Sequence, residues 1–118
     1  MKRILIAGAG GQIGSELVPY LRNIYSNDTV VATDVRECKG LADEGPFEVL
    51  DALNPTNMAS AVARHNIDTI FNLVALLSAV GERNPQMAWG VNMGALMNSL
   101  EVARQHHCAL FTPSSIGA

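Results

Sequence analysis

The chain has little cysteine and no long hydrophobic run. Two cysteines, Cys38 and Cys108, cannot form the framework of several disulfides that stabilises small secreted domains, so we expect a protein of the reducing cytoplasm. No stretch approaches the roughly 18 apolar residues that a membrane-spanning helix needs. The start, MKRILIAGAGG, places two cations before an apolar run, but that run is too short for a signal peptide and ends in glycines. We therefore predict no membrane association.

Charge is also sparse. Charged residues make up 16% of the chain, the formal net charge is −3, and the eight lysines and arginines are scattered. Without a basic stripe, we expect no nucleic-acid partner. His106, His107 and Cys108 are adjacent in the sequence, but neighbouring side chains do not converge easily on one ion and no further ligand cluster accompanies them. We therefore predict no metal site.

What the chain does have is a regular alternation of apolar segments and helical patterns. With 118 residues and 48% hydrophobic content, it is long enough for one packed domain. An α/β fold with a doubly wound parallel sheet, a Rossmann fold, is predicted by this alternation. The expected strands are residues 3–8, 29–34, 47–51, 68–75 and 109–115, and the expected helices are residues 12–25, 55–65 and 85–106, with a polar loop at 35–46.

The first expected helix carries both a clear pattern and an anomaly. Apolar residues recur at helical spacing and predict its buried face: Ile13, Leu17, Leu21 and Ile24. Pro19 lies inside this pattern and predicts a lost hydrogen bond or a kink.

A glycine-rich turn joins the first strand to this helix. Gly8, Gly11 and Gly14 in GAGGQIG have a G-x-x-G-x-x-G spacing; the G-x-G-x-x-G spacing fails because its last position is Ile13. Glycines allow the main chain to approach a pyrophosphate closely, and the helix N-terminus offers it free N–H groups. The alternative is a glycine turn that serves packing alone.

An acidic residue at the end of the second strand favours the first interpretation. Asp34 follows Gly14 by 20 residues, where a carboxylate binds the ribose hydroxyls of a dinucleotide. A carboxylate there repels a 2′-phosphate, so we expect NAD rather than NADP. Arg36 is close enough to weaken this preference, although a solvated surface arginine is its simpler interpretation.

Further segments follow in the order found in a known family. LDAL at residues 50–53, NLVA at 72–75, VNMGALMNSLEVA at 91–103 and PSSIGA at 113–118 resemble the extended short-chain dehydrogenase/reductase family, which includes sugar-nucleotide epimerases and dehydratases. In that family the second of these segments lines the cofactor and the first cradles adenine. The resemblance implies these cofactor-binding residues: Gly8, Gly11, Gln12, Ile13, Gly14, Asp34, Val35, Asp51, Ala52, Leu53, Leu73, Ala75 and Asn92.

Longer stretches resemble one branch of the family, the short-chain L-threonine 3-dehydrogenases: GAGGQIGSELVPYLR, FNLVALLSAVGERNPQMAWGVNM and PSSI. Such enzymes oxidise the hydroxyl of L-threonine to give 2-amino-3-ketobutyrate and NADH. The resemblance implies that Ser78 faces the amino-acid substrate and that the catalytic Ser115 hydrogen-bonds its hydroxyl. From the residues alone, Ser78 is a loop serine and Ser115 caps a turn at a strand end.

The base of this family, a tyrosine followed four residues later by a lysine, is absent from the sequence. Tyr20 and Tyr25 are followed at that spacing by Ile24 and Thr29. We therefore expect the cofactor-binding, N-terminal part of a longer enzyme, inactive by itself, with the substrate domain also missing. The alternatives are a sugar-nucleotide epimerase or dehydratase on the same scaffold and a non-catalytic NAD-binding module.

The long helix at residues 85–106 has apolar residues on more than one face. One stripe contains Ala88, Val91, Ala95 and Val102, and another contains Trp89, Met93, Leu96 and Leu100. One of them must cover the sheet, and the other predicts a partner subunit, because an exposed apolar stripe is unfavourable in water. Family members dimerise through this helix, so the resemblance implies a homodimer. The alternative is that a further domain covers the second stripe.

Overall fold

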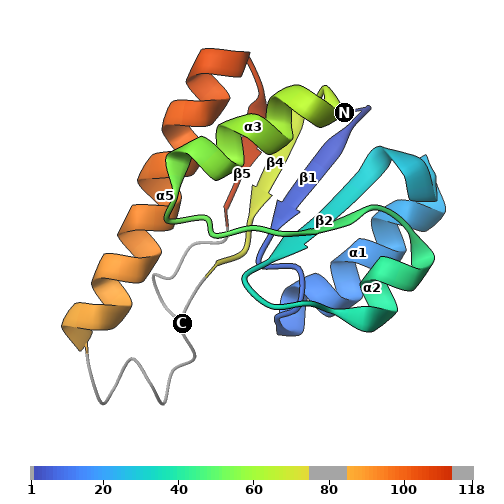
Figure 1. Cartoon of the computed structure of the whole chain (residues 1–118), viewed down its shortest axis with the longest axis horizontal. Coiled ribbons are helices and arrows are strands. Elements are labelled where there is room, and N and C mark those ends of the chain that lie inside the picture. The colour runs from blue at the N-terminus through green and yellow to red at the C-terminus, as the bar shows by residue number, and fades with distance from the viewer. Residues whose placement is uncertain (1, 75–84, 113–118) are drawn as a thin grey trace.

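One sheet of five parallel strands organises the chain (Figure 1), in the order β3-β2-β1-β4-β5. The structure is a computed structural model and describes residues 2–74 and 85–112. The strands are β1 (Ile4–Ala7), β2 (Val30–Asp34), β3 (Phe47–Val49), β4 (Thr69–Asn72) and β5 (Ala109–Phe111). The helices are α1 (Gln12–Tyr25), the 3₁₀ turn η1 (Asn27–Thr29), α2 (Lys39–Glu44), α3 (Pro55–His65) and α5 (Pro85–His106). This confirms the doubly wound α/β fold predicted from the sequence.

Helices cover both faces of the sheet, α1 and α2 on one side and α3 and α5 on the other (Figure 1). Successive side chains of a strand point to opposite faces. Ile4 and Ile6 of β1 accordingly pack in the cluster that includes Val18 of α1, whereas Leu5 and Ala7 pack in the cluster with residues of α3 and α5. All four β1 side chains are buried, which explains why this strand is apolar without alternation.

The buried face of α1 matches the predicted one only in part: Leu21 is buried and Leu17 packs against the core, as the spacing predicts. Ile13 and Ile24, expected in the core, are 55% and 54% exposed, and the buried residues are Gly14, Val18, Leu21 and Arg22. The physical reason is Gly14, whose missing side chain lets the helix lie directly against the main chain of Ala9. This contact fixes the rotation of α1 and turns Ile13 outward.

Pro19 lies on the exposed side of α1. The carbonyl that loses its intrahelical donor belongs to Ser15, which is also exposed. Water can therefore satisfy this carbonyl, and the proline is tolerated inside the helix.

The polar loop predicted at residues 35–46 contains a short helix, α2 (Lys39–Glu44). Its Leu41 packs against the α1 side of the core, and the Leu41 carbonyl accepts a hydrogen bond from Arg22 Nη1 at 2.8 Å. These tertiary contacts stabilise a turn whose local sequence, with Gly40 in it, does not predict a helix.

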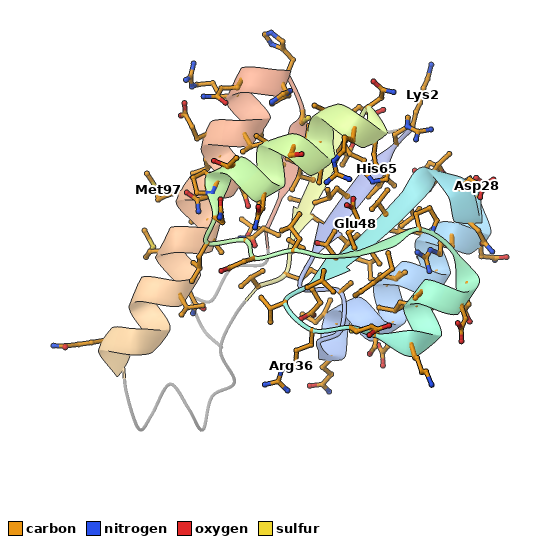
Figure 2. The ribbon with its side chains drawn as sticks, in the orientation of Figure 1. Lys2, Asp28, Arg36, Glu48, His65 and Met97 are labelled. Carbon is orange, nitrogen blue, oxygen red and sulfur yellow. The ribbon has the colours of Figure 1, made fainter. Side chains whose placement is uncertain are left out.

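The predicted start of α3 is confirmed. The Asn54 side chain accepts hydrogen bonds from the main-chain N–H groups of Thr56 at 3.0 Å and Asn57 at 3.2 Å, and Pro55 is the first helical residue. At the other end of α3, Arg64 and His65 contact Glu48 of β3 at 2.6 and 2.5 Å, and Figure 2 shows Glu48 and His65 side by side. Burial raises the pKa of Glu48, but these hydrogen bonds outweigh it and hold the pKa below 4.5. The cluster joins β3 to the helix that follows it.

The long helix α5 packs one face against the sheet. Ala95, Ser99 and Val102 are buried, whereas Met97 and Leu100 are 57% and 47% exposed. Figure 2 shows Met97 on the side of α5 that faces away from the sheet. The side chains of Ala88 and Trp89 lie outside the described residues.

Residues 2–74 and 85–112 lack two features, a membrane-spanning helix and a cluster of metal ligands. Neither α5 nor any other described helix combines the length and apolar composition needed to cross a membrane. The same residues contain no cluster of three histidine, cysteine, aspartate or glutamate side chains that could hold a metal ion.

Candidate functional site

A pocket of about 230 Å³ lies where the carboxyl ends of the strands meet. Its position follows from the topology: the chain passes from β1 outward to β2 and β3 on one side, and then back to β4 on the other side of β1. Ligands of doubly wound sheets bind where the strand order reverses in this way. The pocket is lined by Gly8, Gly11, Asp34, Val35, Leu50, Asp51, Ala52, Leu53, Leu73, Val74 and Val91.

Gly8 forms the floor of the pocket at the end of β1. Its φ is +81°, in the region that favours glycine, and a Cβ there would lie 2.8 Å from the carbonyl carbon of Leu73. The N–H of Leu73 donates to the Ala7 carbonyl at 2.8 Å, so the chain after β4 crosses directly over this turn. Gly8 is therefore required for the close approach of the two strand ends.

The N-terminus of α1 points its free N–H groups toward this turn. A Cβ on Gly14 would overlap the main chain of Ala9, 2.7 Å from its Cα, which keeps the first turn of the helix against the strand end. Gly11 at the N-cap has no side chain that could accept a hydrogen bond. The N–H groups of Gln12, Ile13 and Gly14 therefore remain available to an anion.

Asp34 lies at the mouth of the pocket, at the end of β2. Its Oδ2 accepts the N–H of Gly10 in the glycine turn at 2.8 Å, and its Oδ1 accepts the N–H of Arg36 at 3.4 Å. The carboxylate thus links the turn to β2 and still has lone pairs for hydroxyl donors. The side chain of Arg36 is exposed and points away from the body of the molecule (Figure 2).

The segment of residues 50–53 forms a second wall. The N–H of Leu50 donates to the Asp34 carbonyl at 2.8 Å, which anchors the segment beside β2. Asp51 Oδ1 accepts the N–H of Leu53 at 2.9 Å, so its other carboxylate oxygen is left for a ligand. A flat ring can enter between this segment and the end of β2.

Cys38 approaches the glycine turn from the outside. A Cβ on Gly10 would lie 2.7 Å from the Cys38 sulfur and 2.9 Å from Asp34 Oδ2, so a larger residue here would displace one of these side chains. Burial, and then the charge of Asp34, raise the pKa of the Cys38 thiol. The thiol therefore stays neutral beside the carboxylate.

The pocket brings together most of the residues proposed from the sequence. It contains Gly8, Gly11, Asp34, Val35, Asp51, Ala52, Leu53 and Leu73. Gln12, Ile13 and Gly14 adjoin it through the first turn of α1. Asn92 is half-buried on α5 without lining the pocket, and Ala75, Ser78 and Ser115 lie outside the described residues.

Sequence reasoning missed Gly10, Leu50, Val74 and Val91 as parts of the site. Leu50 and Val74 lie inside the segments LDAL and NLVA that carry the family resemblance, but neither was among the residues assigned to the cofactor. Val91 belongs to one of the two apolar stripes of the long helix, and that helix also reaches the pocket. Gly10 occupies a variable position of the G-x-x-G-x-x-G spacing, although it is the second glycine of the G-x-G-x-x-G spacing that Ile13 breaks.

These features fit a dinucleotide. Two glycines let the strand ends and the first turn of α1 pack closely where a Cβ would collide with main chain, an uncapped helix N-terminus offers donors, and a carboxylate lies at the end of β2.

Comparisons with known proteins agree with this fit. An uncharacterized epimerase/dehydratase of Staphylococcus haemolyticus is 53% identical over 120 residues, covering 100% of this chain and 38% of the relative. Among solved structures, the L-threonine dehydrogenase of Clostridium difficile superposes with a TM-score of 0.94 at 46% identity, covering 100% of this chain and 38% of that one. The holo form of an L-threonine dehydrogenase from Cupriavidus necator superposes with a TM-score of 0.90 at 44% identity, covering 97% of this chain and 37% of that one.

A more distant structure agrees in fold alone. The UDP-glucose 4-epimerase of Thermus thermophilus, solved in complex with NAD, has a TM-score of 0.78 at 24% identity, covering 89% of this chain and 34% of that one. The chain thus spans less than two fifths of the length of the proteins it resembles. The sequence profile of one family matches residues 4–117, and the chain accordingly belongs to the NAD dependent epimerase/dehydratase family.

Proposed function

We propose that the chain is the NAD-binding part of an oxidoreductase that converts L-threonine to 2-amino-3-ketobutyrate. The observation that carries the cofactor assignment is Asp34, whose carboxylate lies at the pocket mouth within 2.8 Å of the glycine turn. A single carboxylate in this place reaches both a ribose and the main chain that surrounds the pyrophosphate.

Each part of the cofactor has proposed partners along the pocket. The N–H groups of the first turn of α1 bind the pyrophosphate, Asp34 and Val35 bind the adenosine ribose, and the segment of Asp51, Ala52 and Leu53 binds adenine. The remaining proposed residues, toward the nicotinamide, are Leu73, Ala75 and Asn92.

We infer NAD rather than NADP as the cofactor. A 2′-phosphate would be placed against the carboxylate of Asp34, and like charges repel. The only cation near this carboxylate in the sequence, Arg36, directs its side chain outward (Figure 2).

The substrate assignment rests on likeness to L-threonine dehydrogenases, which extends over 97% or more of this chain at 44–46% identity. NAD, when bound, accepts the hydride from the β-carbon of the substrate. For this chain we propose that Ser115 donates a hydrogen bond to the substrate hydroxyl or accepts one from it, and that Ser78 contacts the amino-acid part.

Two other functions are compatible with the same site. A sugar-nucleotide epimerase or dehydratase is favoured by the family, although the solved epimerase resembles this chain only in fold. A non-catalytic NAD-binding module is the second, and a Tyr-x-x-x-Lys pair downstream in the longer protein would reject it.

We also propose that the complete protein is a cytoplasmic homodimer. The exposed Met97 and Leu100 on the outer side of α5 would lie in the subunit contact. Apolar side chains grouped on one exposed helix face favour association.

Calorimetric titration of the chain with NAD⁺ and NADP⁺ tests the cofactor. Replacing Asp34 with alanine is expected to weaken NAD⁺ binding at least about tenfold, because charge-assisted hydrogen bonds to the ribose are lost. The matched control is Asp28→Ala, the same change at an exposed aspartate of η1. Equal affinity for NAD⁺ and NADP⁺, or an unchanged NAD⁺ affinity in a folded Asp34→Ala chain, would contradict the assignment.

A chimera tests the substrate. These 118 residues would replace the matching segment of the Clostridium difficile L-threonine dehydrogenase, to which they superpose over their whole length. We expect threonine-dependent reduction of NAD⁺, lost in the Ser115→Ala chimera. A chimera that binds NAD⁺ but leaves threonine unchanged, beside an active parent enzyme, would reject threonine as the substrate.

A further inference from the structure

One polar side chain of α5 reaches across to the segment of residues 50–53. Asn98 Nδ2 donates a hydrogen bond to the Ala52 carbonyl at 3.0 Å. Ala52 is only 3% exposed, so its carbonyl needs a protein donor. Asparagine has a low helix propensity, so helix formation by α5 does not explain why an asparagine occupies position 98.

The same face of α5 contacts the segment at two more positions. Val91 lines the pocket, and Gly94, one turn before Asn98, lies under Leu53: a Cβ on Gly94 would come within 2.9 Å of Leu53 Cδ2. Residues three, four and seven apart share a helix face. This face of α5 thus lines the pocket with Val91, leaves space at Gly94 for the Leu53 side chain, and donates a hydrogen bond from Asn98 to the Ala52 carbonyl.

The segment is held from both ends by its own neighbours. Leu50 is hydrogen-bonded to the Asp34 carbonyl, and Asn54 caps α3. Between these anchors, Asn98 holds the Ala52 carbonyl from outside the segment. The position of Asp51 and Leu53 relative to the pocket therefore depends on the distance between α5 and the segment.

We propose that Asn98 is a positioning residue for the adenine end of the cofactor site, which it controls by fixing the Ala52 carbonyl. The inference rests on the proposed binding of NAD and adds a residue that touches no part of the cofactor. By fixing this segment it also fixes the carboxylate of Asp51, the acceptor that we assign to the adenine amino group. Asn98 accordingly acts on affinity and on recognition of the base.

The test compares two dinucleotides that differ at the base. NAD⁺ and nicotinamide hypoxanthine dinucleotide, in which an oxygen replaces the adenine amino group, would be titrated into wild type, Asn98→Ala and Met97→Ala. Met97 is the matched control, because it is the next residue of α5 and faces away from the sheet. Both changes raise helix propensity, so neither should unfold the chain.

We expect Asn98→Ala to weaken NAD⁺ binding about fivefold, the effect of one lost hydrogen bond, and to weaken the hypoxanthine analogue less. The ratio of the affinities for NAD⁺ and for the hypoxanthine analogue is then smaller in Asn98→Ala than in wild type, whereas Met97→Ala leaves this ratio unchanged. An equal loss for both dinucleotides, an NAD⁺ affinity within about twofold of wild type, or a wild type that does not distinguish the two bases would each overturn the proposal. A wild type that binds neither dinucleotide would instead reject the proposed function.

A second variant, Asn98→Asp, keeps the size of the side chain. It places an oxygen where the amide nitrogen now donates to the Ala52 carbonyl, so the two oxygens repel. We expect a loss of NAD⁺ affinity at least as large as that of Asn98→Ala. An Asn98→Asp chain that binds NAD⁺ like wild type would overturn the hydrogen bond as the cause.

Discussion

Arg22 is a charged residue inside the fold. Its side chain is 3% exposed, and its guanidinium donates to the main-chain carbonyls of Val30, Leu41 and Pro46 at 2.6–3.3 Å. Burial lowers its pKa, and the charge of Glu44 acts in the opposite direction. The planar fork of an arginine can serve three carbonyls from different directions, and the compact head of a lysine cannot. Arg22 therefore joins α1 to β2, α2 and the start of β3.

Arg22→Met is expected to destabilise the chain by about 3 kcal/mol. The substitution retains most of the apolar stem but leaves buried carbonyls without donors, and hydrogen bonds to charged groups contribute about 1.5–3 kcal/mol each. Urea denaturation measures the change. Arg104→Met is the matched control, since Arg104 is exposed and pairs with Glu101 on the same helix, and its unfolding midpoint should stay near that of wild type. Equal midpoints for the two variants would refute a structural role for Arg22.

The role of Arg22 was not predictable from the sequence. An arginine inside an amphipathic helix is expected on its solvated face, and the three carbonyls that it binds lie 8 to 24 residues away in the chain. Only the packing of α2 against α1 brings these groups together. In contrast, Asp34 was predictable, because its place at the end of a buried strand is a local feature.

At the scale of the element, α1 shows how one glycine sets the orientation of a helix. Periodicity placed Ile13, Leu17, Leu21 and Ile24 inside, and the structure turns the helix so that Gly14 and Val18 face the sheet. Both stripes have helical spacing, so periodicity alone does not choose between them. The choice depends on the close contact of Gly14 with Ala9, which is a tertiary property.

Two glycine-to-alanine substitutions separate this contact from helix propensity. Gly14→Ala places a methyl group into the main chain of Ala9 and should destabilise the chain by about 2 kcal/mol, as overpacking does. Gly90→Ala in α5 meets no atom within 4 Å and should stabilise it by up to about 1 kcal/mol. Thermal or urea unfolding measures the change in the free energy of unfolding for both variants. Stabilisation of both variants would show that propensity, and not the contact with Ala9, governs these positions.

The Asn-Pro start of α3 and the strand positions were predictable, because caps and apolar runs are local signals. The short helix α2 was not, since Leu41 and Arg22 stabilise it from outside its own six residues. The same limit applies to the site. The glycine turn and Asp34 could be predicted, whereas the contacts of Gly94 and Asn98 with the segment of residues 50–53 depend on the packing of α5.

At the scale of the whole molecule, the pocket joins parts of the chain that are far apart in sequence. The glycine turn, the end of β2 and the segment of residues 50–53 meet because they lie at the carboxyl ends of the adjacent strands β1, β2 and β3. Direct hydrogen bonds, Gly10 to Asp34 and Leu50 to Asp34, connect these three parts. A ligand that spans the pocket should therefore affect all three parts together.

Hydrogen exchange with and without NAD⁺ tests this connection. We expect NAD⁺ to slow amide exchange in residues 10–14, 34–36 and 50–53, because each contacts the ligand or a residue that does, and to leave η1 unchanged. Inorganic pyrophosphate, which has neither ribose nor base, should protect residues 10–14 alone. If NAD⁺ gave the same pattern as pyrophosphate, the cofactor would be held by its phosphates only. The segment backed by α5 would then take no part in binding, and the proposed roles of Asp51 and Asn98 would be wrong.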